Sequence, residues 1–190
     1  MQKNTSINRV VVFCGSNSGN HDVYKTQAAL LGQTLAKHNI ELIYGGTKIG
    51  LMGAVADGVL SNGGKVIGVL PHVLESREIA HEQLTELIFV DTMHERKAKM
   101  NDLCDAVIAL PGGFGTMDEL FEMLTWAQIG LHEKPIALLN TNGFYDPFLS
   151  LVQTMVDSGF LKKSNQEMII VSDSIDDFID KMNAYSPPNE

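Results

Sequence analysis

The sequence has few cysteines, few basic residues and no long hydrophobic run. Its two cysteines, Cys14 and Cys104, lie far apart without metal-site spacing, so we expect free thiols in a reducing compartment, the cytoplasm. Its 14 Lys and Arg against 23 Asp and Glu leave a formal net charge of −9, which argues against a nucleic-acid partner because a phosphate backbone needs clustered cations. No apolar run reaches the roughly 18 residues of a membrane span and the N-terminus has no signal core, so no membrane partner is expected.

The sequence also lacks the patterns of several common sites. Its six histidines show no paired spacing, so no metal site is predicted. The loop 45–53 has neither the Gly-Lys-Ser/Thr ending of a P-loop nor Gly-x-Gly-x-x-Gly. A nucleoside triphosphatase is therefore disfavoured. A nicotinamide-dependent oxidoreductase is disfavoured too, because Asp118 stands where the last glycine of that fingerprint would fall in the later glycine turn.

Short apolar runs alternate with longer amphipathic stretches along the whole chain. This alternation predicts an α/β fold, in which a parallel sheet is covered by helices on both faces. The predicted strands are 10–14, 42–44, 65–70, 87–90, 106–110, 136–139 and 168–171. The predicted helices are 21–38, 51–61, 93–103, 116–129, 145–157 and 175–183. No linker or repeat divides the chain, so we expect one domain over residues 1–190 with an ordered core of about 8–184.

The segment 111–119, Pro-Gly-Gly-Phe-Gly-Thr-Met-Asp-Glu, carries the strongest functional signal. It joins a predicted buried strand to a predicted helix, and a glycine turn that opens a helix directs several backbone N–H groups at one point. The glycines let a ligand approach the backbone without obstruction by a Cβ atom. The segment therefore predicts an anion site that suits phosphate, with the carboxylate of Glu119 beside it.

Two charged residues near this turn allow a structural and a functional interpretation. Thr116 to Glu119 fits a capping box, in which the glutamate only closes its own helix end. Arg96 shares a helical stripe with Met93, Met100 and Leu103, so it faces inward and needs an anion. That anion could be a buried structural carboxylate, a substrate phosphate or a catalytic glutamate, and the spacing does not choose among them.

Other loops at the same predicted sheet edge provide further candidates. The loop 15–19, which contains Gly15, Ser16, Asn17, Ser18 and Gly19, could contact phosphate or ribose hydroxyls, or form a plain turn. Gly45 and Gly46 follow the second strand and are candidates for the same contacts. Glu78 lies in a long loop, 71–83, which is either a charged surface segment or a lid over the ligand.

The motifs in their order resemble the LONELY GUY (LOG) family of cytokinin riboside 5′-monophosphate phosphoribohydrolases, whose members are often labelled lysine decarboxylases. Residues 111–119 are similar to its PGGxGTxxE signature, and the resemblance covers roughly residues 11 to 158. Six further segments look like family segments: Val11-Val-Phe-Cys-Gly-Ser16, Tyr44-Gly-Gly46, Gly50-Leu-Met-Gly53, Arg77-Glu-Ile79, Met93-His-Glu-Arg-Lys97 and Thr125-Trp-Ala-Gln128.

The resemblance implies a Rossmann-like fold of three α/β/α layers with about seven strands, a homodimer, and no metal or redox cofactor. It implies that Arg96 and Glu119 are catalytic. The implied substrate-binding residues are Glu78, Arg96, Lys97, Gly113, Phe114, Gly115, Thr116, Met117, Asp118, Glu119 and Thr125.

The implied reaction is hydrolysis of the N-glycosidic bond of a purine nucleoside 5′-monophosphate, a cytokinin nucleotide or adenosine monophosphate, which yields free base and ribose 5-phosphate. The alternative is a non-catalytic nucleotide-binding protein of the same fold. Base release from the nucleotide would distinguish the two.

Overall fold

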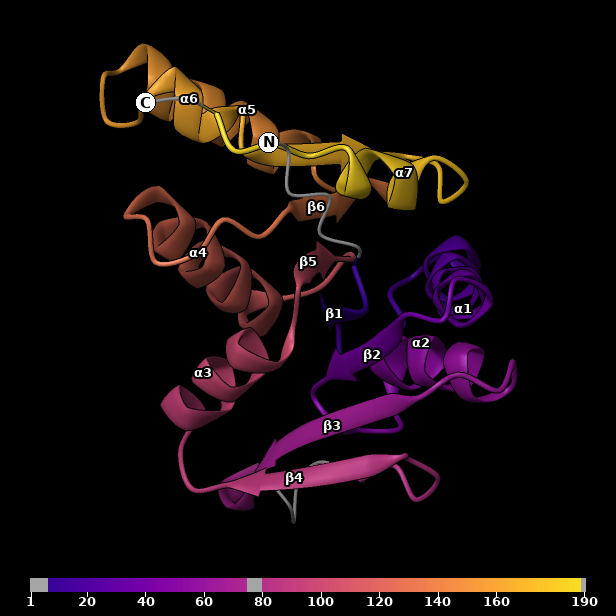
Figure 1. Cartoon of the computed structure of the whole chain (residues 1–190). Coiled ribbons are helices and arrows are strands. Elements are labelled where there is room, and N and C mark those ends of the chain that lie inside the picture. The colour runs from indigo at the N-terminus through magenta and orange to yellow at the C-terminus, as the bar shows by residue number, and fades with distance from the viewer. Residues whose placement is uncertain (1–6, 75–79, 189–190) are drawn as a thin grey trace.

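The structure, a computed structural model, describes residues 7–74 and 80–188. The seven predicted strands form one entirely parallel sheet in the order β4-β3-β2-β1-β5-β6-β7 (Figure 1). The strands are β1 (Arg9–Phe13), β2 (Glu41–Tyr44), β3 (Val66–Pro71), β4 (Glu86–Val90), β5 (Ala106–Ala109), β6 (Ile136–Leu139) and β7 (Ile169–Ser172). Val11 in β1 pairs with Ile43 of β2 on one side and Val107 of β5 on the other. Strand order reverses between β1 and β5, and such a switch point opens a crevice at the carboxyl ends of the strands.

Helices cover both faces of this sheet, which confirms the predicted fold class. Helices α1, α2 and α7 lie on one side, and α3, α4 and α5 on the other (Figure 1). The helices are α1 (Asp22–Lys37), α2 (Gly50–Leu60), α3 (Met93–Leu103), α4 (Phe114–Gln128), α5 (Asp146–Asp157), α6 (Lys163–Gln166) and α7 (Phe178–Asn183), with 3-10 turns η1 (His72–Leu74) and η2 (Thr141–Gly143). Within the described ranges, no helix is long and apolar enough to cross a membrane.

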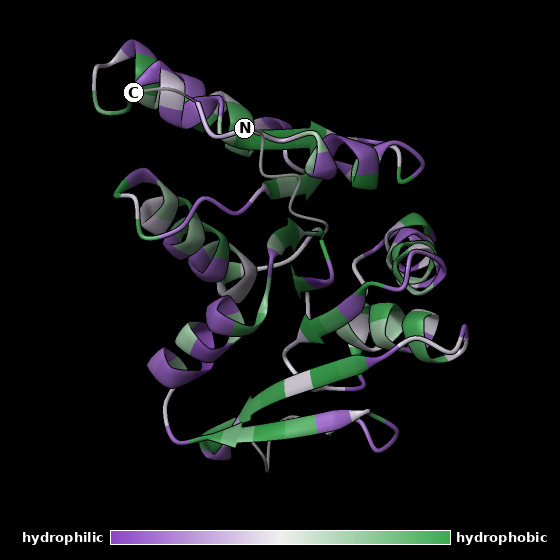
Figure 2. Ribbon diagram, in the orientation of Figure 1, coloured by the Kyte–Doolittle hydropathy of each residue, from purple (hydrophilic) through white to green (hydrophobic). Residues whose placement is uncertain are grey.

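Alternate residues along the central strands belong to two separate core layers. Val10 and Val12 of β1 are buried against α1 and α2, whereas Val11 and Phe13 are buried against α3 and α4. This follows from the two-residue period of a strand, which sends successive side chains to opposite faces. Figure 2 shows the strands largely in hydrophobic colours, as expected for a sheet that is covered on both faces.

Two helices begin two or more residues away from their predicted start. Helix α4 begins at Phe114, two residues before the predicted start. Helix α7 begins at Phe178 and not at Ile175, because Asp177 binds Ser172 Oγ at 2.9 Å and holds the preceding residues in a turn. Helix α6 and the two 3-10 turns were not predicted, since three or four residues are too few to show a helical period.

Candidate functional site

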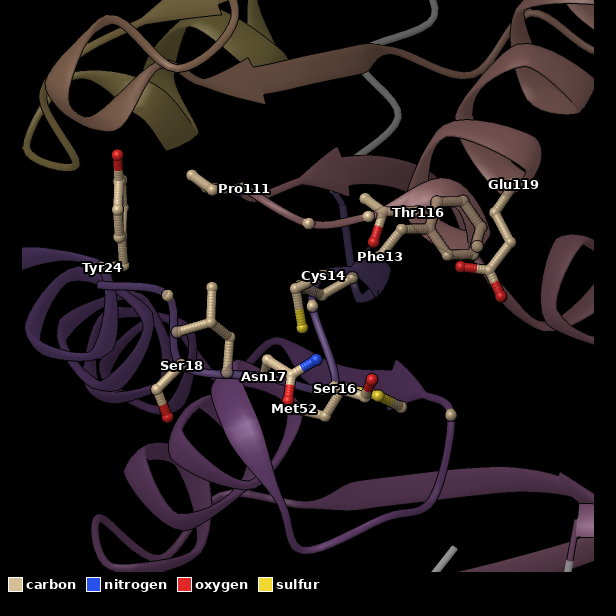
Figure 3. A pocket seen from close by; sticks show the side chains of 18 of the residues that line it. Phe13, Cys14, Ser16, Asn17, Ser18, Tyr24, Met52, Pro111, Thr116 and Glu119 are labelled. Carbon is tan, nitrogen blue, oxygen red and sulfur yellow. The ribbon is translucent and has the colours of Figure 1, made fainter. Parts of the chain in front are cut away.

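A cavity of about 500 Å³ opens at the switch point, at the carboxyl ends of β1 and β5. Its walls are the turn 14–20 after β1, the turn 111–113 after β5, the beginning of α4, and side chains from α1, α2 and α3. Figure 3 shows Glu119 and Tyr24 at opposite sides of the view, with Cys14, Pro111 and Thr116 between them. Of the loops that the sequence placed at one sheet edge, those after β1, β2 and β5 therefore do meet around one space.

The two turns pack so closely that they need glycine. Gly15 N donates to Pro111 O at 3.0 Å. A Cβ atom on Gly112 would collide with the Thr116 hydroxyl and would lie 2.9 Å from Gly15 N. Because neighbouring backbone leaves no room for a methyl group here, the shape of the cavity floor depends on the absence of that side chain.

The first turn of α4 lines the cavity with an open helix N-terminus. Its N-cap residue is Gly113, and in the described chain it has neither a side-chain cap nor an acidic residue in its first turn. Gly113, Phe114, Gly115 and Thr116 all line the cavity. The first N–H groups of a helix have no intrahelical acceptor, so this end presents donors and positive dipole charge to an anion.

The capping-box interpretation of Glu119 is wrong. Since α4 begins at Phe114, Thr116 lies inside the helix and cannot be its N-cap. Glu119 instead lines the cavity. Burial, and then the negative charge of Glu119, raise the pKa of the Cys14 thiol, so that wall carries a neutral thiol next to the carboxylate.

Arg96 lies in α3 with only 5% of its surface exposed, and it lines the same cavity. Its Nε donates to Val69 O at 3.1 Å and one terminal nitrogen donates to Gly45 O at 3.2 Å. A Cβ on Gly45 would collide with that terminal nitrogen. Both acceptors are backbone carbonyls, so these bonds fix the guanidinium without a carboxylate neutralising its charge. Among the described residues, the alternative of a structural ion pair therefore gains no support.

The other predicted contacts lie in several places. Lys97 binds Asp118 and Glu122 at 3.1 and 3.2 Å, away from the cavity lining. Met117 packs against the core layer of α4, and Thr125 donates to Phe121 O within the helix. Gly46 accepts a hydrogen bond from His81 N. Gly15, Ser16 and Gly45 do line the cavity, and Glu78 lies outside the described residues. The assignment of all these residues to substrate stays a prediction.

Sequence reasoning missed part of the lining. Asn17 and Ser18 are not among the missed residues, because they belong to the strand-end turn 15–19 that the sequence offered as a whole. Tyr24 comes from α1 and Phe144 from the segment after η2, and their rings meet edge to face at 6.3 Å. No local pattern links these two aromatic residues, because only the packing of α1 beside η2 brings them together.

Known proteins resemble this chain over most of its length. The family model described as "Possible lysine decarboxylase" matches residues 52–182. The chain is 46% identical to the "Probable cytokinin riboside 5'-monophosphate phosphoribohydrolase" LOGL2 of Oryza sativa subsp. japonica, over 96% of this chain and 75% of that protein. It is 44% identical to the cytokinin riboside 5′-monophosphate phosphoribohydrolase LOG1 of Arabidopsis thaliana, over 100% of this chain and 89% of that protein.

Solved structures of lower identity share the fold alone. The molybdenum cofactor binding protein of Rippkaea orientalis superposes with a TM-score of 0.69 at 21% identity, covering 93% of this chain and 95% of that one. The molybdenum cofactor carrier protein of Chlamydomonas reinhardtii gives 0.66 at 21%, covering 91% and 94%. Because it is 44–46% identical to the two plant phosphoribohydrolases over nearly its whole length, the chain belongs to the LOG family of cytokinin riboside 5′-monophosphate phosphoribohydrolases.

Proposed function

We propose that this protein hydrolyses the N-glycosidic bond of a cytokinin riboside 5′-monophosphate and releases the free base and ribose 5-phosphate. The observation that carries the proposal is one cavity lined by an open helix N-terminus, a buried arginine and a glutamate. The printed activity of relatives that are 44–46% identical over nearly the whole chain supports it.

The 5′-phosphate would bind at the first turn of α4. No side chain of the described residues caps the N–H groups there, and Gly112, Gly113 and Gly115 leave the backbone accessible. Ser16 lines the facing turn and can add a hydroxyl donor. Such binding, remote from the broken bond, orients the ribose and makes a nucleoside without phosphate a poor substrate.

Glu119 would act on the sugar. Cleavage of the bond develops positive charge at C1′ and O4′, and a fixed carboxylate beside the ring stabilises that charge. The same carboxylate can hold ribose hydroxyls or orient the attacking water. The neighbouring Cys14 thiol stays protonated, since burial and the charge of Glu119 raise its pKa; Glu119 thus supplies the negative charge on that wall.

Arg96 would face the substrate as a fixed cation. Its bonds to Val69 O and Gly45 O use two of its nitrogens and leave further N–H groups for the cavity. A buried guanidinium that lacks a carboxylate in these bonds gains free energy from an anionic ligand. Glu78, Met117 and Thr125 remain proposed contacts on the resemblance to the family, and Gly46 remains one from its place after β2. The same resemblance suggests contacts for Lys97 and Asp118.

We further propose that adenosine monophosphate is also a substrate, and that the protein works as a homodimer in the cytoplasm. Phe114, Ile129 and Leu131, at or just beyond the two ends of α4, are 97%, 63% and 66% exposed, and large exposed apolar side chains suit a contact between copies. The two buried free thiols suit a reducing compartment.

A base-release assay tests the proposed function. Purified protein is incubated with the 5′-monophosphate of N6-isopentenyladenosine, with adenosine monophosphate and with adenosine, and free base is measured by chromatography. We expect release from the first two and little from adenosine. Glu119→Gln removes the charge at constant size and should lower kcat by about a thousandfold.

The matched control is Glu167→Gln, because Glu167 is exposed and lies outside the cavity lining. Its turnover should equal that of the unaltered protein. Full turnover in Glu119→Gln would contradict the assigned role. Nucleotide binding without any base release by the unaltered protein would favour the non-catalytic alternative.

A further inference from the structure

The ammonium of Lys97 joins two helices just outside the cavity. Its Nζ lies 3.1 Å from a carboxylate oxygen of Asp118 and 3.2 Å from one of Glu122. The Lys97 side chain is only 12% exposed, although it carries a charge. Lys97 belongs to α3 and both carboxylates belong to α4. One cation therefore bridges two helices that are separate in sequence.

This bridge lies next to the two proposed catalytic residues along the chain. Lys97 directly follows Arg96 in α3, and Asp118 directly precedes Glu119 in α4. Arg96 and Glu119 line the cavity, whereas Lys97, Asp118 and Glu122 do not. Neighbouring residues of a helix point about 100° apart, so each helix presents one residue to the cavity and the next to the bridge.

The charges at this bridge are unsuited to holding a phosphate. Two carboxylates surround one ammonium, so the cluster has an excess of negative charge that would repel a dianion. Burial by itself lowers the pKa of Lys97, but its hydrogen bonds to Asp118 and Glu122 outweigh burial and raise that pKa. Moving the ammonium to a substrate would break both ion pairs.

We propose that Lys97 is a positioning residue: its ion pairs to Asp118 and Glu122 hold α3 against α4 and thereby set where Arg96 and Glu119 face the substrate. The inference rests on the proposed function, and for Lys97 and Asp118 it replaces the nucleotide contact that the family resemblance suggests. Misplacing a catalytic group by about 1 Å costs about a hundredfold in rate, so a modest helix shift is enough to matter.

Exchanging the charges tests the proposal. Lys97→Glu, Asp118→Lys and the double variant are compared in the base-release assay, with kcat and KM measured separately. The double variant restores an opposite-charge pair between the helices and leaves no cation at position 97. We expect Lys97→Glu to lower kcat by about a hundredfold with KM changed by less than about threefold, and the double variant to recover most of kcat.

The matched control exchanges Lys163 and Glu167, an ion pair at 3.9 Å that joins the first residue of α6 to the residue after its end, outside the cavity lining. Neither kinetic constant should change. If Lys97→Glu fails to fold, Lys97→Gln and Lys97→Arg replace it. Lys97→Arg keeps both ion pairs and should keep kcat. Lys97→Gln removes both ion pairs and should lower kcat with KM nearly unchanged.

The proposal would be overturned if the double variant had a kcat as low as that of Lys97→Glu. It would also be overturned, and Lys97 assigned to substrate contact, if Lys97→Glu or Lys97→Gln raised KM and left kcat unchanged. An unaltered protein without base release would overturn the proposed function, and this inference with it. Activity of the unaltered protein thus separates the two failures.

Discussion

Helices α3 and α4 both follow a strand at the same edge of the sheet, but they begin in opposite ways. Before α3, Thr92 Oγ1 accepts a hydrogen bond from Glu95 N at 3.1 Å, and the Glu95 carboxylate accepts one from Asp91 N at 2.9 Å. Before α4, the N-cap is Gly113, and in the described chain no side chain caps it and no acid lies in its first turn.

Closing a helix start and leaving it open serve different purposes. Thr92 Oγ1 occupies the N–H group of Glu95, and the Glu95 carboxylate adds negative charge at the same end. Both stabilise the start of α3 and disfavour an anion there. The open start of α4 lacks that stabilisation and keeps its donors for a ligand.

Gly112→Ala should have the largest effect, because it closes the space in front of α4. The new Cβ would collide with the Thr116 hydroxyl and press on Gly15 N, so the turn and the helix start must move apart. We expect kcat/KM for the nucleotide to fall by about a hundredfold, measured by base release. Gly113→Ala is the comparison, since its Cβ would meet no atom within 4 Å; an equal loss in both variants would contradict the steric argument.

Phe114→Asp should make the start of α4 resemble that of α3 by adding an acid. Phe114 is 97% exposed, so the substitution should leave the core intact. Repulsion of the 5′-phosphate should raise KM by about fivefold to tenfold, and added salt should reduce the difference. Phe114→Asn supplies the same shape without the charge. If both variants raise KM equally, the loss of the ring and not the charge is responsible.

Thr92→Ala should weaken the closed start of α3. Removal of the cap to Glu95 N should lower the free energy of unfolding by about 1 kcal/mol, measured by urea denaturation. Thr92→Ser retains the hydroxyl and should recover most of the loss. Thr116→Ala, inside α4 and at the cavity, should instead change KM. A similar capping loss in Thr116→Ala would contradict the observed helix start.

The smallest effect concerns the bridge between the two helices in alkaline solution. The folded-state pKa of Lys97 is raised above the ordinary 10.5 by its hydrogen bonds to Asp118 and Glu122, against the effect of burial. Its stabilisation is therefore fully present below the unfolded-state pKa and lost as the pH rises through the folded-state pKa. Lys97→Met should be less stable than the unaltered protein at pH about 9 by at most about 1 kcal/mol, and the gap should narrow above 10.5. Unfolding free energies at several pH values would check this; a gap independent of pH would indicate lost packing alone.

Much of the architecture could be read from local pattern. The seven strands appear as apolar runs because a parallel sheet buries both faces, and each predicted run overlaps an observed strand. Arg96 was expected on an inward stripe and is buried. Local pattern failed where two sites share one motif. Thr-x-x-Glu occurs at Thr92–Glu95 and at Thr116–Glu119, but only the first closes a helix.

By itself the sequence determined the family, the alternation of strands and helices, and the glycine turn that begins α4, because these depend on residue order and local conformational preference. Only the tertiary structure decided that Glu119 and Arg96 line the same cavity, that Tyr24 and Phe144 meet there, and that Lys97 pairs with Asp118 and Glu122. The reason is that these contacts join residues from different strand–helix units, and their distances depend on how the helices pack across the sheet.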